Sequence, residues 1–177
     1  MLLAPLTPHA FRPPRVYGHG WIAAWESPEA FARHEEGLAD DGFWTLLAPV
    51  RIYGRWPAHP GLEASQQAAS DGRAAVLTLG RLRPSRAPAF LRASAGAEHQ
   101  ALQSSAMSFG TAMASPSLIV ATFSIWDDLQ AMRSFVEGGG HAGAMTANAH
   151  RPFHRESAFV RYEILHQNGV PPTPELA

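Results

Sequence analysis

Cysteine is absent from this sequence of 177 residues. Disulfide bonds, thiolate nucleophiles and iron–sulfur clusters are therefore excluded. Lysine is absent as well, because all 14 basic residues are arginines. A lysine Schiff base, and with it ordinary pyridoxal-phosphate chemistry, is thus excluded too. Any metal centre must take its protein ligands from histidine, methionine, tyrosine or carboxylates, and nine histidines are available.

Long apolar runs are also lacking, since none approaches the roughly 20 residues that a membrane-spanning helix requires. The apolar start, Met1 to Leu6, is interrupted by Pro5 and has no basic segment before it. We therefore expect neither a secretory signal nor a membrane span, and we expect a cytoplasmic protein. The net charge of −1 gives no basic surface for nucleic acid. Sequence motifs for nucleotide binding, zinc hydrolysis and nucleophilic serine catalysis are absent.

A single α+β domain is predicted from the succession of segments with strand and helix character. The expected divisions are a proline-rich arm at 1–15, the domain at 16–165 and a tail at 166–177. Within the domain, residues 57–72 are rich in proline, glycine, alanine, serine and glutamine, which is typical of a linker. The hydrophobic share of 46% suffices for one core.

Ser27, Ser85 and Asp127 each stand where a helix is expected to begin, because serine and aspartate side chains cap helix N-termini. The helix after Ser85 is expected to reach about Leu102. Three glycines, 138–140, are expected to end the helix after Asp127. That helix carries an apolar stripe, which consists of Leu129, Met132, Phe135 and Val136.

Extended segments are predicted where apolar and β-branched residues gather between turn signals. They are Val16–Trp25, Phe43–Trp56, Arg73–Leu82, Leu118–Trp126 and Ser157–Leu165, with Ser108–Gly110 assigned to a loop. Two stretches, 21–31 and 122–132, are similar. Each leads through a tryptophan–acid pair (Trp25-Glu26 and Trp126-Asp127) to a helix start. We therefore predict a ferredoxin-like α+β barrel built from two related half-repeats, about 16–56 and 73–165, with the two pairs in equivalent positions.

The second half carries a recognisable succession of motifs. They are Thr122-Phe123-Ser124-Ile125-Trp126, Asp127, Ala131-Met132, Phe135, the glycine run, His141 and Arg155-Glu156. This succession resembles the C-terminal half of spheroidene monooxygenases, and Arg51–Trp56 and the Phe11-x-Pro13 arm resemble other segments of that family. The similarity covers most of the chain and is strongest from about Leu118 to Leu165. It implies a haem (iron) protein that inserts oxygen into a carotenoid, an apolar small-molecule substrate, with electrons from a ferredoxin-type partner.

His141 is the candidate iron ligand that this resemblance implies. It follows the glycine run, and the small residues after it would let a flat macrocycle approach the backbone. A helix N-terminus disfavours protonation, which keeps an imidazole able to coordinate a metal. Met145, on the same helix, is a further candidate for cofactor contact. Without the resemblance, a solvent-facing histidine at a helix N-terminus is the favoured explanation of this position.

His154 and Arg155 are the remaining candidates. His154 is interpreted as a polar group on the distal side of a bound ligand, or alternatively as a cap of the turn before the last strand. Arg155 would pair with a haem propionate, or alternatively form a surface ion pair. A two-histidine metal site from His150 and His154 is disfavoured, because Pro152 interrupts the helix between them.

Two further interpretations remain open at this point: a cofactor-free barrel enzyme of the antibiotic-biosynthesis type, and a non-catalytic small-molecule binding barrel. The family usually has one more strand and helix before the proline-rich arm, so the resemblance implies an incomplete first half-barrel. Because an unpaired sheet edge promotes aggregation, we expect a homodimer or an N-terminal arm that covers the edge.

Overall fold

The computed structural model describes residues 1–6, 18–35, 37, 42–56 and 72–172. Within them the elements follow the order β1 (Leu2–Pro5), β2 (Gly18–His19), α1 (Pro28–Glu35), β3 (Trp44–Arg55), β4 (Ala74–Leu82), η1 (Pro84–Arg86), α2 (Ala87–Leu102), β5 (Met107–Ala114), β6 (Ile119–Trp126), α3 (Leu129–Glu137), α4 (Gly139–His150) and β7 (His154–Asn168). The predicted linker at 57–72 lies almost entirely outside the described residues, as does most of the predicted N-terminal arm.

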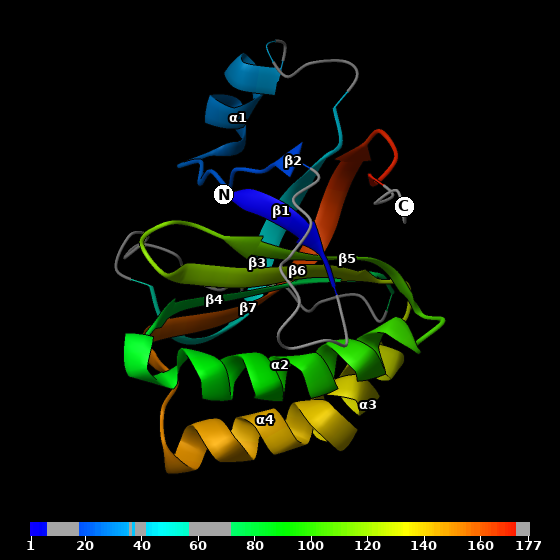
Figure 1. Cartoon of the computed structure of the whole chain (residues 1–177). Helices are drawn as coiled ribbons and strands as arrows, with labels where there is room; N and C mark the ends of the chain where they lie inside the picture. The colour runs from blue at the N-terminus through cyan, green and yellow to red at the C-terminus, as the bar shows by residue number, and fades with distance from the viewer. Residues whose placement is uncertain (7–17, 36, 38–41, 57–71, 173–177) are drawn as a thin grey trace.

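The described strands form one antiparallel sheet with the order β2-β1-β5-β6-β4-β7-β3. The run from β4 to β7 has the connectivity β-α-β-β-α-β, with α3 and α4 together in the second helical position. Its strand order, β5-β6-β4-β7, is the ferredoxin-like arrangement. Helices α2, α3 and α4 cover one face, and α1 lies at the opposite end of the molecule (Figure 1). The predicted α+β ferredoxin-like fold is therefore confirmed.

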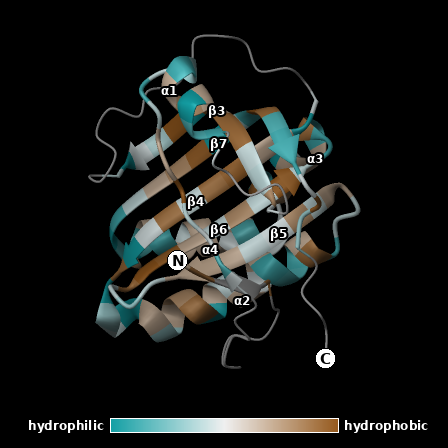
Figure 2. Cartoon of the chain, turned by 90° about the horizontal axis from the view of Figure 1, so that it is seen from above, coloured by the Kyte–Doolittle hydropathy of each residue, from teal (hydrophilic) through white to brown (hydrophobic). Residues whose placement is uncertain are grey.

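Side-chain alternation along the strands divides the apolar residues between two clusters. The helix-side cluster joins Val76 and Trp126 of the sheet to Leu129 and Met132 of α3. The larger cluster lies on the other face, and the hydrophobic residues of the central strands run across the sheet (Figure 2). There, the ring of Phe43, next to the start of β3, lies 5.4 Å from that of Phe109 on β5, although β6, β4 and β7 stand between β5 and β3 in the sheet. The sheet must therefore curve strongly, which gives it the form of a partial barrel.

The prediction of a strand at Val16–Trp25 is wrong for the residues of this segment that the structure describes. Of residues 18–25, only Gly18–His19 pair as a strand, and Trp25 lies in irregular chain before α1. Trp126, by contrast, is the last residue of β6. The two tryptophan–acid pairs are thus not in equivalent positions, since only one of them ends a strand. The complete β-α-β-β-α-β unit lies between Ala74 and Asn168, while the described part of 16–56 contributes α1 and β3 after the short β2.

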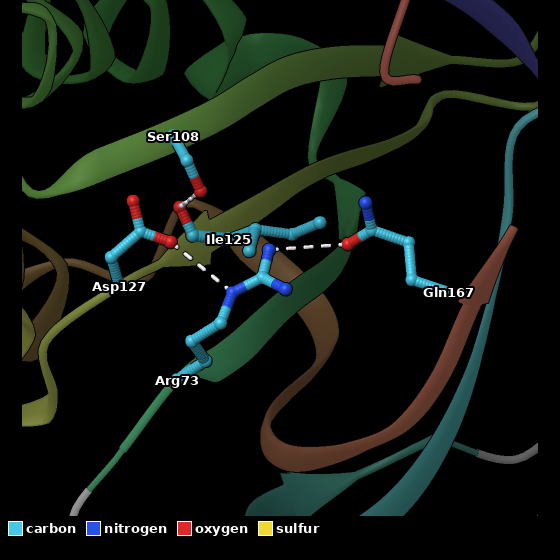
Figure 3. A network of polar contacts seen from close by, with 5 residues as sticks. All are labelled: Arg73, Ser108, Ile125, Asp127 and Gln167. Carbon is cyan, nitrogen blue, oxygen red and sulfur yellow. Dashed lines mark hydrogen bonds and ion pairs between the residues drawn. The ribbon is translucent and has the colours of Figure 1, made fainter. Parts of the chain in front are cut away.

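Three local predictions are corrected by hydrogen bonding. Ser85 lies inside a 3₁₀ turn, and α2 begins after Arg86 without a side-chain cap. The cap of α3 is Asp128, which accepts from the backbone of Gln130 at 2.7 Å. Asp127 instead accepts from the Arg73 guanidinium, which also donates to Gln167 (Figure 3). Residues 108–110, predicted as loop, belong to β5, where the Ser108 hydroxyl donates to the Ile125 carbonyl (Figure 3).

The N-terminal residues cover one edge of the ferredoxin-like sheet. Strand β1 pairs antiparallel with β5, and β2 pairs with β1. The start of the predicted arm thus occupies the edge that was expected to need a cover. Homodimerisation stays a prediction. None of the helices among the described residues combines the length and apolar character needed to cross a membrane.

Candidate functional site

A cavity of about 90 Å³ lies between the helix-covered face of the sheet and α2, α3 and α4. Its walls are mostly apolar and include Val76, Trp126, Met132, Phe135 and Phe159. Glu98 and His141 are the acidic and basic residues that the described chain contributes to its lining. An apolar space with a few placed polar groups is the usual form of a small-molecule site. We therefore take this cavity as the candidate functional site.

His141 is held at the cavity by three contacts. Its Nδ1 lies 2.9 Å from the carbonyl oxygen of Val136, near the end of α3. Because a carbonyl only accepts, Nδ1 must carry the proton, and in the neutral ring Nε2 then keeps a free lone pair. The ring packs against Phe135 with centroids 5.1 Å apart. The backbone N–H donates to Oε1 of Gln100 at 3.1 Å.

Gln100 is a residue of this site that the sequence did not reveal. Besides accepting from His141, its amide nitrogen donates to the Phe135 carbonyl at 3.3 Å. It therefore ties α2 to the junction of α3 and α4 and satisfies backbone groups that helix ends leave unpaired. A lone glutamine on a helix carries no sequence signal, because its partners lie 35 and 41 residues away.

The glycines before His141 serve helix packing. A Cβ atom added to Gly140 would lie 2.4 Å from the Gly96 carbonyl oxygen, so the two helix backbones are in direct contact. Gly139 has a φ of +52°, which favours glycine and reverses the chain between α3 and α4. The small residues of α4 thus bring it close to α2, which differs from the predicted approach of a macrocycle.

The other predicted site residues are not brought to the cavity. Met145 is 57% exposed on α4, and Arg155 is exposed on β7. Its neighbour Glu156 pairs with Arg81 at 3.2 Å. His154 packs beside Phe90, with ring centroids 5.2 Å apart, and against the backbone of Gly80. Of the four candidates, His141 alone lines the cavity within the described chain.

His154 supplies a pH-dependent contribution to stability. Burial lowers its pKa from the ordinary value of 6.5, because the packed ring resists charging. The unfolded chain therefore binds a proton more readily than the folded chain, and the free energy of unfolding should fall as the pH drops below about 6.5. The free energy of unfolding should level off once the pH lies below the pKa of His154 in the folded chain. Above about 6.5, His154 should not make the free energy of unfolding depend on pH.

Urea unfolding of the His154→Gln variant at pH 7.5 and 5.5 tests this contribution. We expect the variant to lose less stability between the two pH values than the unmodified protein. His150→Gln, at an exposed position at the end of α4, is the matched control for a histidine-to-glutamine change. Equal pH dependence in the unmodified and His154→Gln proteins would contradict the assignment.

The volume of the cavity limits what it can hold. About 90 Å³ is well below the roughly 300–1,000 Å³ of sites for drug-sized molecules. The free Nε2 of His141 suits a metal ligand, but a haem does not fit inside this space as the helices are packed. Among the described residues, no group of three or more histidine, aspartate or glutamate side chains is placed to hold a metal ion.

Two curated proteins that match this chain are both named spheroidene monooxygenase. The one from Rubrivivax gelatinosus is 36% identical over 125 residues, which is 69% of this chain and 47% of the relative. The one from Cereibacter sphaeroides is 26% identical over 167 residues, which is 86% of this chain and 51% of the relative. This chain thus spans about half the length of the curated relatives it matches.

The likeness to solved structures concerns the fold. The crystal structure of a candidate monooxygenase from Fusobacterium nucleatum subsp. nucleatum matches with a TM-score of 0.50 and 8% identity, over 70% of this chain and 51% of that chain. No protein-family model matches the sequence. The curated relatives nevertheless confirm the predicted resemblance: this chain is similar to the spheroidene monooxygenases.

Proposed function

We propose that this chain is the cavity-bearing unit of a monooxygenase-type oxidoreductase that acts on an apolar small molecule. The observation that carries the proposal is the apolar cavity whose wall presents His141, in a chain similar to two proteins named spheroidene monooxygenase. A carotenoid is much longer than this cavity. Only one end of such a substrate can enter it unless α2 and α4 separate.

Each part of the site has a role in this proposal. Trp126, Phe135 and Phe159 exclude water and bind the apolar end of the substrate. His141 keeps Nε2 as a hydrogen-bond acceptor for the hydroxyl group that the reaction would introduce into the substrate, and the Val136 carbonyl fixes the ring orientation and tautomer. The resemblance further implies a ferredoxin-type electron donor and a haem that activates oxygen. A haem does not fit in the cavity of about 90 Å³ as the helices are packed.

The proposal is tested by incubating the purified chain with spheroidene in mild detergent under oxygen. One reaction contains hemin and a reduced ferredoxin, and the other contains the reduced ferredoxin without hemin. We expect a product that has gained one oxygen atom, detected by mass spectrometry. Product in the reaction without hemin would favour the cofactor-free mechanism. Failure of both reactions, together with no quenching of tryptophan fluorescence by the polyene, would overturn the proposed function.

Two substitutions separate the chemical role of His141 from its structural role. His141→Asn retains an N–H that can donate to Val136 but removes Nε2, so we expect the fold to persist and the conversion rate to fall at least tenfold. His150→Asn is the control on the exposed side of the same helix, and it should convert substrate at the unmodified rate. An undiminished rate in folded His141→Asn would remove His141 from the mechanism.

A further inference from the structure

Three arginines gather at the β3–β7 edge of the sheet, outside the cavity. Arg51 on β3 and Arg161 on β7 are direct cross-strand partners. Because paired residues of antiparallel strands point to the same face, both side chains share one side of the sheet. Arg133 comes from α3, and its charge and that of Arg51 reach Arg161. Phe159 lines the cavity under the helices, and Arg161 follows it by two residues on the same face of β7, so Arg51 and Arg161 lie on the helix-covered side of the sheet.

This arrangement is unfavourable without a counterion. Like charges placed directly opposite on neighbouring strands destabilise a sheet. Burial is the main cause of the lowered pKa of Arg161, and the charges of Arg133 and then Arg51 lower it further. Tyr53 relieves part of the repulsion, since the Arg51 guanidinium lies 4.8 Å from the centre of its ring.

Acidic partners for these arginines are lacking in the described part of the chain. Glu137 follows Arg133 by one helical turn, and Glu163 follows Arg161 by two residues, yet neither forms an ion pair with the cluster. The Nε–H of Arg161 is buried and has no hydrogen-bond partner among the described residues. A buried, unsatisfied donor on a cation is costly, and such a group usually signals a missing acceptor.

We propose that Arg51, Arg133 and Arg161 form a binding site for the oxyanion of a small molecule, either a carboxylate or a phosphate. Such a group would accept hydrogen bonds from the guanidinium groups, including the unpartnered Nε of Arg161, and would neutralise their repulsion. Tyr53, which is 50% exposed beside the cluster, adds a hydroxyl group.

The anion site adjoins the apolar cavity through one residue. Phe159 lines the cavity, and its ring lies 6.2 Å from that of Tyr53, its cross-strand partner. A ligand held at the arginines therefore lies one aromatic layer from the cavity. The anion site does not depend on the proposed oxidoreductase function, and its test requires no turnover.

Binding is tested by adding sodium phosphate, or disodium succinate as the carboxylate, to the whole chain at constant ionic strength. Two readouts are used: the melting temperature, and the Nε–H signals of the arginines in a ¹H–¹⁵N spectrum. We expect at least one anion to raise the melting temperature and to shift the Arg161 signal with saturation at millimolar concentrations. The signal is identified by its loss in Arg161→Gln. Phosphate alone or succinate alone would identify the ligand group, whereas no response to either would overturn the proposal.

Charge-matched variants separate this site from general salt effects. Arg51→Gln and Arg133→Gln should weaken binding about tenfold, the effect of losing one hydrogen bond to a charged group. Arg33→Gln removes the same charge from the exposed surface of α1 and should leave binding within twofold of the unmodified protein. In the absence of anion, Arg51→Gln should melt at the same temperature or higher, because it removes a repulsive pair. Equal anion responses in all three variants would refute a specific site.

Discussion

Replacing Trp126 by alanine is expected to destabilise the fold by about 3–5 kcal/mol, the usual cost of truncating a buried large aromatic residue. Trp126 is 1% exposed and lies where the sheet meets α3. Its ring packs on Phe135 with centroids 5.0 Å apart, and its indole N–H donates to the Ser124 hydroxyl at 2.9 Å. Truncation would remove these contacts, leave the Ser124 hydroxyl without its donor and join the freed volume to the cavity.

Urea unfolding measures this loss as a lower midpoint at constant slope, which identifies a change in stability. Trp21→Ala provides the matched control. Trp21 is 66% exposed, so its removal should change stability by no more than about 0.5 kcal/mol. Comparable losses of stability in the two variants would show that Trp126 does not stabilise the packing of the helices on the sheet.

Much of the fold was predictable because several segments have a single strong periodicity. The stripe of Leu129, Met132, Phe135 and Val136 fits one face of a helix, and α3 spans it. The glycines that follow cannot continue a regular helix, since Gly138 is extended and Gly139 has positive φ. Apolar, β-branched residues similarly identified β6, which is mostly apolar and whose residues are all buried or half-buried because both faces of the sheet are covered there.

Strand β5 was not predictable from its own residues. Met107–Ala114 contains two alanines, two methionines and a glycine, which have little β-propensity. The segment is a strand because it pairs with β6 on one side and β1 on the other. The wrong prediction of a strand that ends at Trp25 has a different cause. Its sequence resembles that before Trp126, but the described residues before it gain no sheet partner beyond Gly18–His19.

The candidate site was predictable in part, for a geometric reason. His141 faces the cavity because the chain reversal at Gly139 places it between Val136 and Gln100. Met145, His154 and Arg155 are near it in sequence, but the α4 helix and the alternation of β7 direct them elsewhere. The family resemblance and the glycine run therefore identified one residue of the site. Its partner Gln100 required the tertiary packing of α2 against α4.

Replacing Gly140 by alanine is expected to destabilise the protein by about 1–3 kcal/mol, the usual cost of overpacking. The new Cβ would meet the Gly96 carbonyl oxygen at 2.4 Å and the Ala97 nitrogen at 3.0 Å. Both are backbone atoms, so α2 and α4 must separate and His141 must move with α4.

Gly143→Ala, on the same helix, is the control, because no atom lies within 4 Å of the new Cβ. Alanine there should stabilise the helix by about 0.5–1 kcal/mol, because it is the better helix former. Thermal unfolding of the two variants should therefore shift the melting temperature in opposite directions. If Gly140→Ala were instead as stable as Gly143→Ala, the close crossing of α2 and α4, and with it the position of His141 at the cavity, would be wrong.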